Sequence, residues 1–183
     1  MPEARDGLGV ASVRDADAGG GFSAVQTERA RGFWSELDNL EFVCADALAF
    51  LDEDLRLWDV IYSTWGAVWF TDPDALFPRA LRRLAPGGIL AFSHREPIVG
   101  QYGAQRMGGK WLESRETELT VLRWQHTPEQ WTDLLKRHGF TDISAKVIPA
   151  PDDAPGTLLI TAKAPARTTT PPLRSPRAGG IVV

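Results

Sequence analysis

The segment "WDVIYSTWGAVWFTDPDALFPRALRRLAPGGILAFSH", Trp58 to His94, decides the fold of this chain. It begins and ends with two short runs, "WDVIYS" and "ILAFSH", that are apolar enough to be strands buried on both faces. Between them, Asp72 and Pro73 form a helix start, in which an N-cap residue is followed by proline at the first helical position. Strand, helix and strand in this order predict two parallel strands joined by a crossover helix.

The same alternation continues on both sides of this segment. Toward the N-terminus, "FSAVQTERAR" predicts a helix that starts with a capping box, and "LEFVCA" predicts a strand. Toward the C-terminus, "TELTVLRWQ" predicts a strand, and "TDISAKVI" and "TLLITAKA" predict an antiparallel hairpin after one more helix. The stretch from Arg95 to Glu116 has glycines and little periodicity, which favours a long loop or lid. We therefore expect an α/β sandwich whose mostly parallel sheet ends in an antiparallel C-terminal edge.

Composition divides the chain into three parts. Residues 1–21 are an atypical N-terminal segment, in which the weakly apolar piece "LGVASV" can supply one strand at best. Residues 22–164 contain the alternating strands and helices. Residues 165–183 read "PARTTTPPLRSPRAGGIVV", with almost nothing to bury, and predict a disordered tail.

Charge and cysteine content exclude several classes of function. The net charge of −4 leaves no basic face to grip a phosphate backbone, so nucleic acid is a poor candidate partner. Cys44 is the only cysteine, which excludes a disulfide framework and a multi-cysteine metal site and fits a reducing cytoplasm. The N-terminus lacks the apolar core of a signal peptide, and no apolar run approaches the roughly 20 residues that span a bilayer. We expect a cytoplasmic protein without a metal, which binds neither nucleic acid nor a membrane.

Ligands of open α/β sheets bind beyond the carboxyl ends of the parallel strands. In this sequence these ends are Asp46, the segment from Ser63 to Trp69, and the segment from His94 to Glu96. The candidate functional residues are therefore expected at these three places.

Four segments in order, "FSAVQTERAR", "VCADALAF", "WDVIYSTWGAVWFTDP" and "LRRLAPGGILAFSH", resemble the class I S-adenosylmethionine-dependent methyltransferases. The likeness is to the small-molecule enzymes often called methyltransferase type 11, and it covers about residues 22–164. It implies a Rossmann-like sandwich, S-adenosylmethionine as cofactor, and methyl transfer to a small-molecule acceptor.

The resemblance implies roles for five residues that bind the cofactor. Asp46 matches the acidic residue that accepts a hydrogen bond from the adenine amino group, and Ala47 matches the residue whose backbone amide meets the adenine ring. Ser63, Thr64 and Trp65 match the segment under the methionine part of the cofactor. Asp46 has an alternative interpretation, as the N-cap of the helix predicted at "ALAFL".

The acceptor side of the site has four candidates. Trp69, like Trp65, could wall the methyl-transfer chamber, since an aromatic face near a sulfonium gains roughly 0.5–2 kcal/mol. Methyl transfer depends mainly on alignment, and it needs a base only if a proton of the acceptor must leave early. His94 is the candidate catalytic base, with a polar strand end as its plain alternative. Arg95 and Glu96 could bind a carboxylate or an amine of the substrate.

The chain departs from the family pattern at its N-terminal end. The family starts with a strand, a G-x-G-x-G loop, a helix, and a second strand whose terminal acidic residue binds the ribose. That acidic residue should immediately precede "FSAVQTERAR", but Gly21 stands there. A strand–helix–strand unit takes roughly 30 residues, and only 21 residues precede Phe22. We therefore expect an N-terminally incomplete strand–helix unit. The missing central strand should leave unpaired backbone groups or force its neighbours together.

Two functions remain open at this point. One is an S-adenosylmethionine-dependent enzyme. The other is a truncated, non-catalytic remnant or binding module with weak or no cofactor binding. A dehydrogenase-like protein is disfavoured, because the sequence contains no G-x-G-x-x-G.

Overall fold

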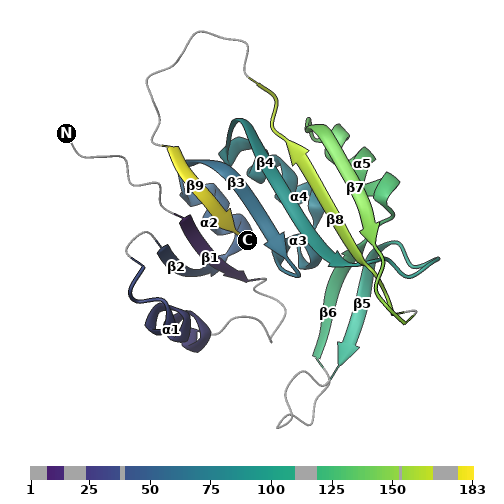
Figure 1. Cartoon of the computed structure of the whole chain (residues 1–183), viewed down its shortest axis with the longest axis horizontal. Coiled ribbons are helices and arrows are strands. Elements are labelled where there is room, and N and C mark those ends of the chain that lie inside the picture. The colour runs from purple at the N-terminus through teal and green to yellow at the C-terminus, as the bar shows by residue number, and fades with distance from the viewer. Residues whose placement is uncertain (1–7, 15–23, 38–39, 110–118, 153, 167–176) are drawn as a thin grey trace.

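A computed structural model (Figure 1) describes residues 8–14, 24–37, 40–109, 119–152, 154–166 and 177–183. The strands are β1 (Leu8–Arg14), β2 (Leu40–Asp46), β3 (Leu57–Thr64), β4 (Leu84–Arg95), β5 (Gly103–Gly109), β6 (Leu119–Gln125), β7 (Thr141–Ile148), β8 (Thr157–Lys163) and β9 (Arg177–Val182). The helices are α1 (Ala24–Phe33), α2 (Ala47–Glu53), α3 (Ala67–Phe70), α4 (Pro73–Arg83) and α5 (Pro128–Arg137). Among these residues, no helix is long and apolar enough to cross a membrane.

A seven-stranded sheet in the order β2-β1-β9-β3-β4-β8-β7 forms the body of the protein. The pairs from β2 to β4 are all parallel, and β8 and β7 add an antiparallel edge. The α/β sandwich with a mostly parallel sheet and an antiparallel C-terminal hairpin is therefore confirmed. The unit from Trp58 to His94 is β3, α3, α4 and β4, as its pattern predicted.

The start of α4 follows the cap predicted at Asp72 and Pro73, and α5 begins at a cap of its own. The Asp72 side chain accepts a hydrogen bond from the backbone N–H of Asp74, with Pro73 at the first helical position of α4. Thr127 and Gln130 form the complete capping box of α5. Each cap satisfies backbone donors that the first helical turn leaves without a partner.

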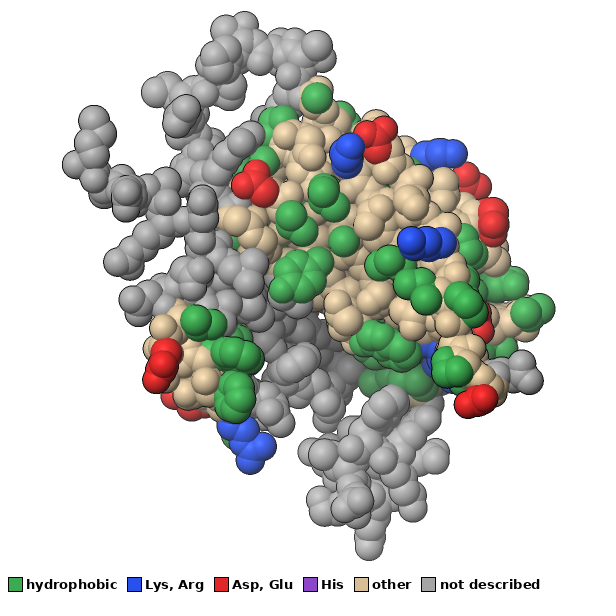
Figure 2. All heavy atoms as spheres, in the orientation of Figure 1, with side chains coloured by type: hydrophobic (Ala, Val, Ile, Leu, Met, Phe, Trp, Pro, Cys, Tyr) green, Lys and Arg blue, Asp and Glu red, His purple; other side chains and the backbone are tan. Residues whose placement is uncertain are grey.

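Helices α2, α4 and α5 lie behind the sheet in Figure 1, and the core is the layer between them and the strands. Its fully buried large side chains include Trp58, Phe77, Leu51, Ile61, Leu76, Leu90, Trp131, Leu135, Leu158, Ile160 and Ile181. In Figure 1 no described helix crosses the opposite face of β3, β4 and β8. Hydrophobic and uncharged side chains stand across the middle of that face in Figure 2. Val60 and Ile89 are accordingly only half-buried.

The C-terminal strand β9 is where the prediction of a disordered tail is wrong. Residues 177–182 form this strand in the middle of the sheet, parallel to β1 and to β3. The side chain of Ile181 is fully buried in the core, and the backbone N–H of Val183 donates to the carbonyl oxygen of Tyr62 at 2.8 Å. A strand with partners on both sides needs few apolar side chains of its own, because the sheet satisfies its backbone. Residues 167–176 of the predicted tail lie outside the described residues.

β9 also occupies the place of the central strand that we expected to be missing. The segment "LGVASVR" supplies β1, the one strand expected before Phe22, and α1 and β2 follow it. The place between β1 and β3 belongs to β9. β9 is in register with β1 at Gly9 and Val10 and with β3 from Leu57 to Tyr62, so β1 and β3 do not move together.

The stretch from Arg95 to Glu116, predicted as a long loop or lid, contains a strand instead. Residues 103–109 form β5, which pairs antiparallel with β6 over the whole of both strands. This two-stranded sheet projects from one end of the main sheet in Figure 1. The composition "GAQRMGG" has weak strand propensity, so the pairing depends on its partner β6, which is distant in sequence. Residues 110–118 lie outside the described residues.

Substituting Ile181 tests whether β9 is part of the sheet. Ile181→Ala should lower the free energy of unfolding by about 2–5 kcal/mol, because it leaves a cavity in the core. Val147→Ala on β7 is the control, since this side chain is 37% exposed and its loss should change stability by about 0.5 kcal/mol or less. Urea unfolding followed by tryptophan fluorescence measures both. Equal stability of the two variants would show that Ile181 is not buried beneath the sheet.

Candidate functional site

The carboxyl ends of the parallel strands meet at one edge of the sheet, here named the carboxyl edge. Arg14 at the end of β1 is in register with Asp46 at the end of β2, and Thr64 of β3 is in register with Ser93 of β4. The candidate residues of β2, β3 and β4 therefore share one edge, although up to 50 positions separate them in the sequence.

Asp46 and Ala47 lie at the junction of β2 with α2. Asp46 is the N-cap of α2, and its Oδ1 accepts a hydrogen bond from the backbone N–H of Ala49 at 2.9 Å. The capping interpretation is thus confirmed. It does not exclude adenine binding, because a carboxylate has a second oxygen that can accept another donor. Ala47 is fully buried, its backbone included.

Ser63, Thr64 and Trp65 form a sharp turn at the end of β3. The Ser63 side chain is buried, and its Oγ accepts a hydrogen bond from the N–H of Val68 at 3.2 Å, which orients the start of α3. Thr64 is exposed. Trp65 has a φ of 52°, a conformation that costs a bulky residue of order 1–3 kcal/mol and is typical of functional sites. Its N–H donates to the carbonyl oxygen of Ser93 at 2.8 Å, while its side chain is 47% exposed.

Gly66 brings the end of β9 against this turn. A Cβ at this position would lie 2.8 Å from the carbonyl oxygen of Val183 and 3.0 Å from the Oγ of Ser63. Only glycine allows this approach without a shift of the backbone. The turn after β3 and the end of β9 are therefore packed directly on one another.

Aromatic rings join the turn to the end of β4. The ring of Trp69 meets that of Trp65 edge to face, with centroids 5.2 Å apart and planes at 86°. Trp69 stacks in parallel on His94, at 5.5 Å and 3°. Phe92 and Trp131 are the other two ring neighbours of His94, at 6.2 Å and 5.8 Å. Trp69 and His94 are both buried, in contrast to the exposed Trp65.

His94 is neutral in this environment. Burial lowers its pKa from 6.5 to about 4, and the nearby His126 and Arg123 also lower it, whereas the hydrogen bond to the Arg95 backbone opposes the shift. Its Nδ1 lies 2.7 Å from the carbonyl oxygen of Arg95. Since a carbonyl cannot donate, Nδ1 carries the proton and Nε2 carries a lone pair. Nε2 is buried and has no partner among the described residues, so it can accept a hydrogen bond from a ligand.

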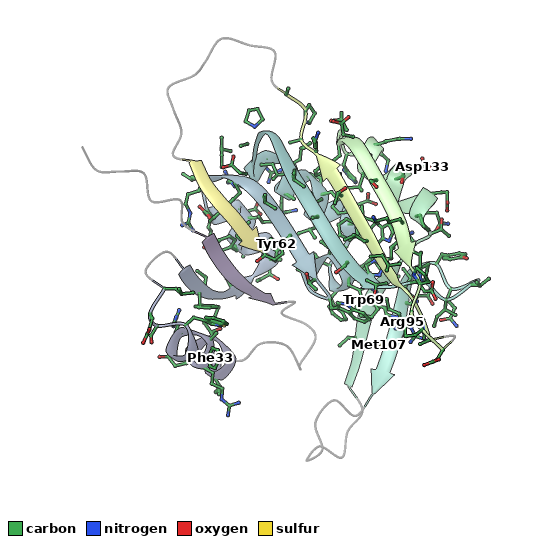
Figure 3. The ribbon with its side chains drawn as sticks, viewed as in Figure 1. Phe33, Tyr62, Trp69, Arg95, Met107 and Asp133 are labelled. Atoms are coloured by element: carbon green, nitrogen blue, oxygen red, sulfur yellow. The ribbon has the colours of Figure 1, made fainter. Side chains whose placement is uncertain are left out.

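Arg95 and Glu96, the other candidates at the end of β4, have different surroundings. Oε1 of Glu96 accepts the N–H of Gly156 at 2.8 Å, and the backbone of Glu96 also bonds Gly156. This carboxylate therefore holds the loop before β8. In the view of Figure 3, Arg95 is drawn in the same region as Trp69 and Met107, where β5 and β6 meet the main sheet.

Two residues that the sequence analysis missed, Arg123 and Gln125, come from β6. They are 8% and 0% exposed. The Arg123 guanidinium lies 5.6 Å from the ring centroid of Trp69, and its Nη1 donates to the sulfur of Met107 at 3.1 Å. Burial, and secondly the charge of Arg95, lower the pKa of Arg123.

The alternation of "TVLRWQ" does place Arg123 and Gln125 on the same face of β6. The other face carries Leu122 and Trp124, and apolarity alone predicts that this face is the buried one. In the structure Leu122 is 45% exposed, whereas Arg123 and Gln125 are buried. The only signal in the sequence was the alternation of polar and apolar residues along β6. This alternation does not show which face is buried, because that depends on what β6 packs against.

Comparison with known proteins identifies the fold. Residues 9–92, from β1 into β4, match the family model described as a methyltransferase domain. The match begins earlier than the resemblance at Phe22, because it includes β1. A structure from Mesorhizobium loti, an S-adenosylmethionine-dependent methyltransferase, superposes with a TM-score of 0.57 over 89% of this chain and 93% of its own, at 19% identity. This chain has the fold of the class I S-adenosylmethionine-dependent methyltransferases.

Two further structures with this methyltransferase fold contain S-adenosylhomocysteine. One is the 1,6-didemethyltoxoflavin-N1-methyltransferase of Burkholderia thailandensis, which also holds 1,6-didemethyltoxoflavin. Its TM-score is 0.57 over 87% of this chain and 72% of its own, at 18% identity. The other is the glycopeptide N-methyltransferase MtfA, with a TM-score of 0.55 over 87% of this chain and 82% of its own, at 17% identity. No curated protein sequence matches this chain.

The lowered pKa of His94 predicts a pH-dependent stability. Between pH 6.5 and pH 4 the unfolded chain binds a proton at this residue and the folded chain does not, so unfolding is favoured as the pH falls. The contribution is complete above pH 6.5 and amounts to about 3 kcal/mol, since each pKa unit is worth about 1.4 kcal/mol.

Urea unfolding of wild type and His94→Phe at several pH values measures this contribution. Phenylalanine keeps a ring between Trp69 and Phe92 but cannot bind a proton, so the stability of the variant should vary less steeply with pH between 4 and 6.5. All other titrating groups are the same in both proteins and cancel. Identical slopes would contradict the burial of a neutral His94.

Proposed function

We propose that this chain binds S-adenosylmethionine at the carboxyl edge and transfers its methyl group to a small-molecule acceptor. The observation that carries the proposal is the turn at Trp65, a strained and exposed tryptophan that β3 and β9 hold at this edge. Asp46 lies at the same edge, at the end of β2. Bound S-adenosylhomocysteine in two proteins of the same fold supports the choice of cofactor.

The residues at the carboxyl edge fit the chemistry of the cofactor in two places. Asp46 offers a carboxylate oxygen, and Ala47 a backbone amide, to an adenine ring. The segment from Ser63 to Trp65 would lie under the methionine part. We assign no residue to the ribose hydroxyls, because Asp15, which follows β1 in the sequence, lies outside the described residues. When bound, S-adenosylmethionine would supply an activated methyl group together with its own leaving group.

The acceptor would bind beside Trp69 and His94. Catalysis of methyl transfer mainly requires that the acceptor atom is held in line, and the stacked rings of these two residues offer rigid walls for that purpose. The lone pair of His94 Nε2 would accept a hydrogen bond from an O–H or N–H of the acceptor. With a pKa of about 4, His94 is a weak base, so we propose that it orients the acceptor rather than removes its proton before transfer.

The second candidate function is a binding module without catalysis. Two observations favour it. The sequence has no G-x-G-x-G segment, and the central strand β9 is formed by residues 177–182. The two candidates differ in whether the chain binds the cofactor.

We also propose a cytoplasmic location, because Cys44, the one cysteine of the sequence, is an exposed free thiol.

Isothermal titration with S-adenosylhomocysteine tests the proposal. The wild type should bind, and Asp46→Asn should bind roughly tenfold more weakly, the equivalent of about 1.4 kcal/mol. Asparagine is as good an N-cap as aspartate, so α2 should keep its stability while one carboxylate oxygen is replaced by an amide donor.

Asp72→Asn is the matched control, because Asp72 caps α4 in the same way. This variant should bind like the wild type. If the folded wild type shows no binding at millimolar ligand, the chain is not an S-adenosylmethionine-dependent enzyme, and the second candidate function stands.

A further inference from the structure

Buried polar atoms of β4, α3 and β6 lie where the β5–β6 sheet meets the main sheet, and we name this group the polar cluster. His94 stacks on Trp69, and Arg123 lies over the same ring. Its members without a hydrogen-bond partner among the described residues are His94 Nε2, Trp69 Nε1, Arg95 Nε, Arg123 Nε, and both amide atoms of Gln125. His94 and Gln125 are 0% exposed, and Arg123 is 8% exposed. Buried polar groups are almost always hydrogen-bonded, so a concentration of exceptions in one place indicates a ligand site.

The cluster has a strong excess of positive charge and of donors. Burial lowers the pKa of Arg123, and the charge of Arg95 lowers it further, so the two guanidinium groups lie in the same region. Among the described residues, neither arginine forms an ion pair with a carboxylate, whereas Arg79, Arg82 and Arg137 on the outer surfaces of helices do. The nearby carboxylate of Glu96 is bonded to Gly156.

Buried charges are stable only when a partner of opposite charge or a set of hydrogen bonds compensates them. Among the residues that the structure describes, Arg123 contacts the sulfur of Met107 and the face of Trp69, and neither carries a negative charge. A ligand that completes this arrangement must therefore be an anion. A planar anion such as a carboxylate matches the donor geometry of a guanidinium.

The aromatic side chains beside the polar cluster indicate which apolar group the ligand carries. Trp65 and Trp69 stand edge to face, and Trp65 is 47% exposed at the end of β3. An exposed indole next to a buried one offers a planar apolar surface beside the two cations. Rings stack on such surfaces in offset or edge-to-face arrangements.

We infer that the methyl acceptor is a small aromatic carboxylate, whose carboxylate is held by Arg95 and Arg123 and whose ring lies against Trp65 and Trp69. Gln125 and His94 Nε2 then orient the polar substituents of the ring. That this ligand is the methyl acceptor rests on the proposed function. The anion site itself depends only on the contacts of the polar cluster.

The test compares carboxylates with neutral molecules of the same shape. Benzoate, cinnamate and 2-naphthoate are each titrated against their carboxamides, with and without saturating S-adenosylhomocysteine, and binding is followed by saturation-transfer NMR. Carboxylates should bind at least tenfold more tightly than the amides in one of the two conditions. Arg95→Gln and Arg123→Gln should each weaken carboxylate binding roughly 10- to 100-fold, as expected for a charge-assisted hydrogen bond, and should leave amide binding unchanged.

Arg106→Gln is the matched control, because Arg106 lies on β5 of the same two-stranded sheet but is exposed. It should bind carboxylates like the wild type. Arg123→Lys keeps the charge in case the glutamine variant unfolds, and it should retain more affinity than Arg123→Gln. Arg95, which is half-buried, provides a second variant with less risk to folding.

Equal affinities for carboxylates and amides, or an equal loss in Arg106→Gln and Arg123→Gln, would overturn the inference. The outcome is independent of the cofactor titration. Carboxylate binding without S-adenosylhomocysteine binding would support the anion site and reject methyl transfer. Cofactor binding without any preference for carboxylates would reject the anion site and leave methyl transfer standing.

Discussion

A strand in the middle of a parallel sheet must satisfy backbone donors and acceptors on both of its sides, and in this protein that strand is the last one in the chain. β9 lies between β1 and β3 and pairs with both. Without it, the β1–β2 pair would have no strand pairing with the rest of the described sheet, since β1 and β3 are not paired. The buried side chain of Ile181 and the approach of Val183 to Gly66 depend on the same strand.

This constraint also organises the carboxyl edge. Because β9 and β3 run in the same direction, the end of β9 meets the turn at Trp65 and Gly66, and the close contact there holds the strained tryptophan in place. The adenine-side candidates at Asp46 belong to β2, which is joined to β3 within the sheet through β1 and β9. One strand therefore joins both halves of the candidate cofactor site.

The polar cluster does not depend on β9. It lies where the two-stranded β5–β6 sheet meets the end of β4 and α3, so its side chains come from elements with different partners. A buried polar group without a hydrogen bond costs about 1–3 kcal/mol, so several of them in one place need a physical explanation. Aromatic packing contributes stability in the same region, where Trp69, Phe92 and Trp131 surround His94.

The sequence by itself determined the local elements of this protein and the places of three strand ends. Caps at Asp46, Asp72 and Thr127 depend on neighbours within three residues, and the strands around Trp58 and His94 are apolar enough to be recognised without their partners. Only the tertiary structure decided that "RAGGIVV" is a central strand, that "GAQRMGG" pairs with β6, and that β6 buries Arg123 and Gln125 rather than Leu122. The physical reason is the same in all three cases. Strand pairing is satisfied by backbone atoms of residues far away in sequence, and these contacts leave no periodic mark in the strand's own side chains.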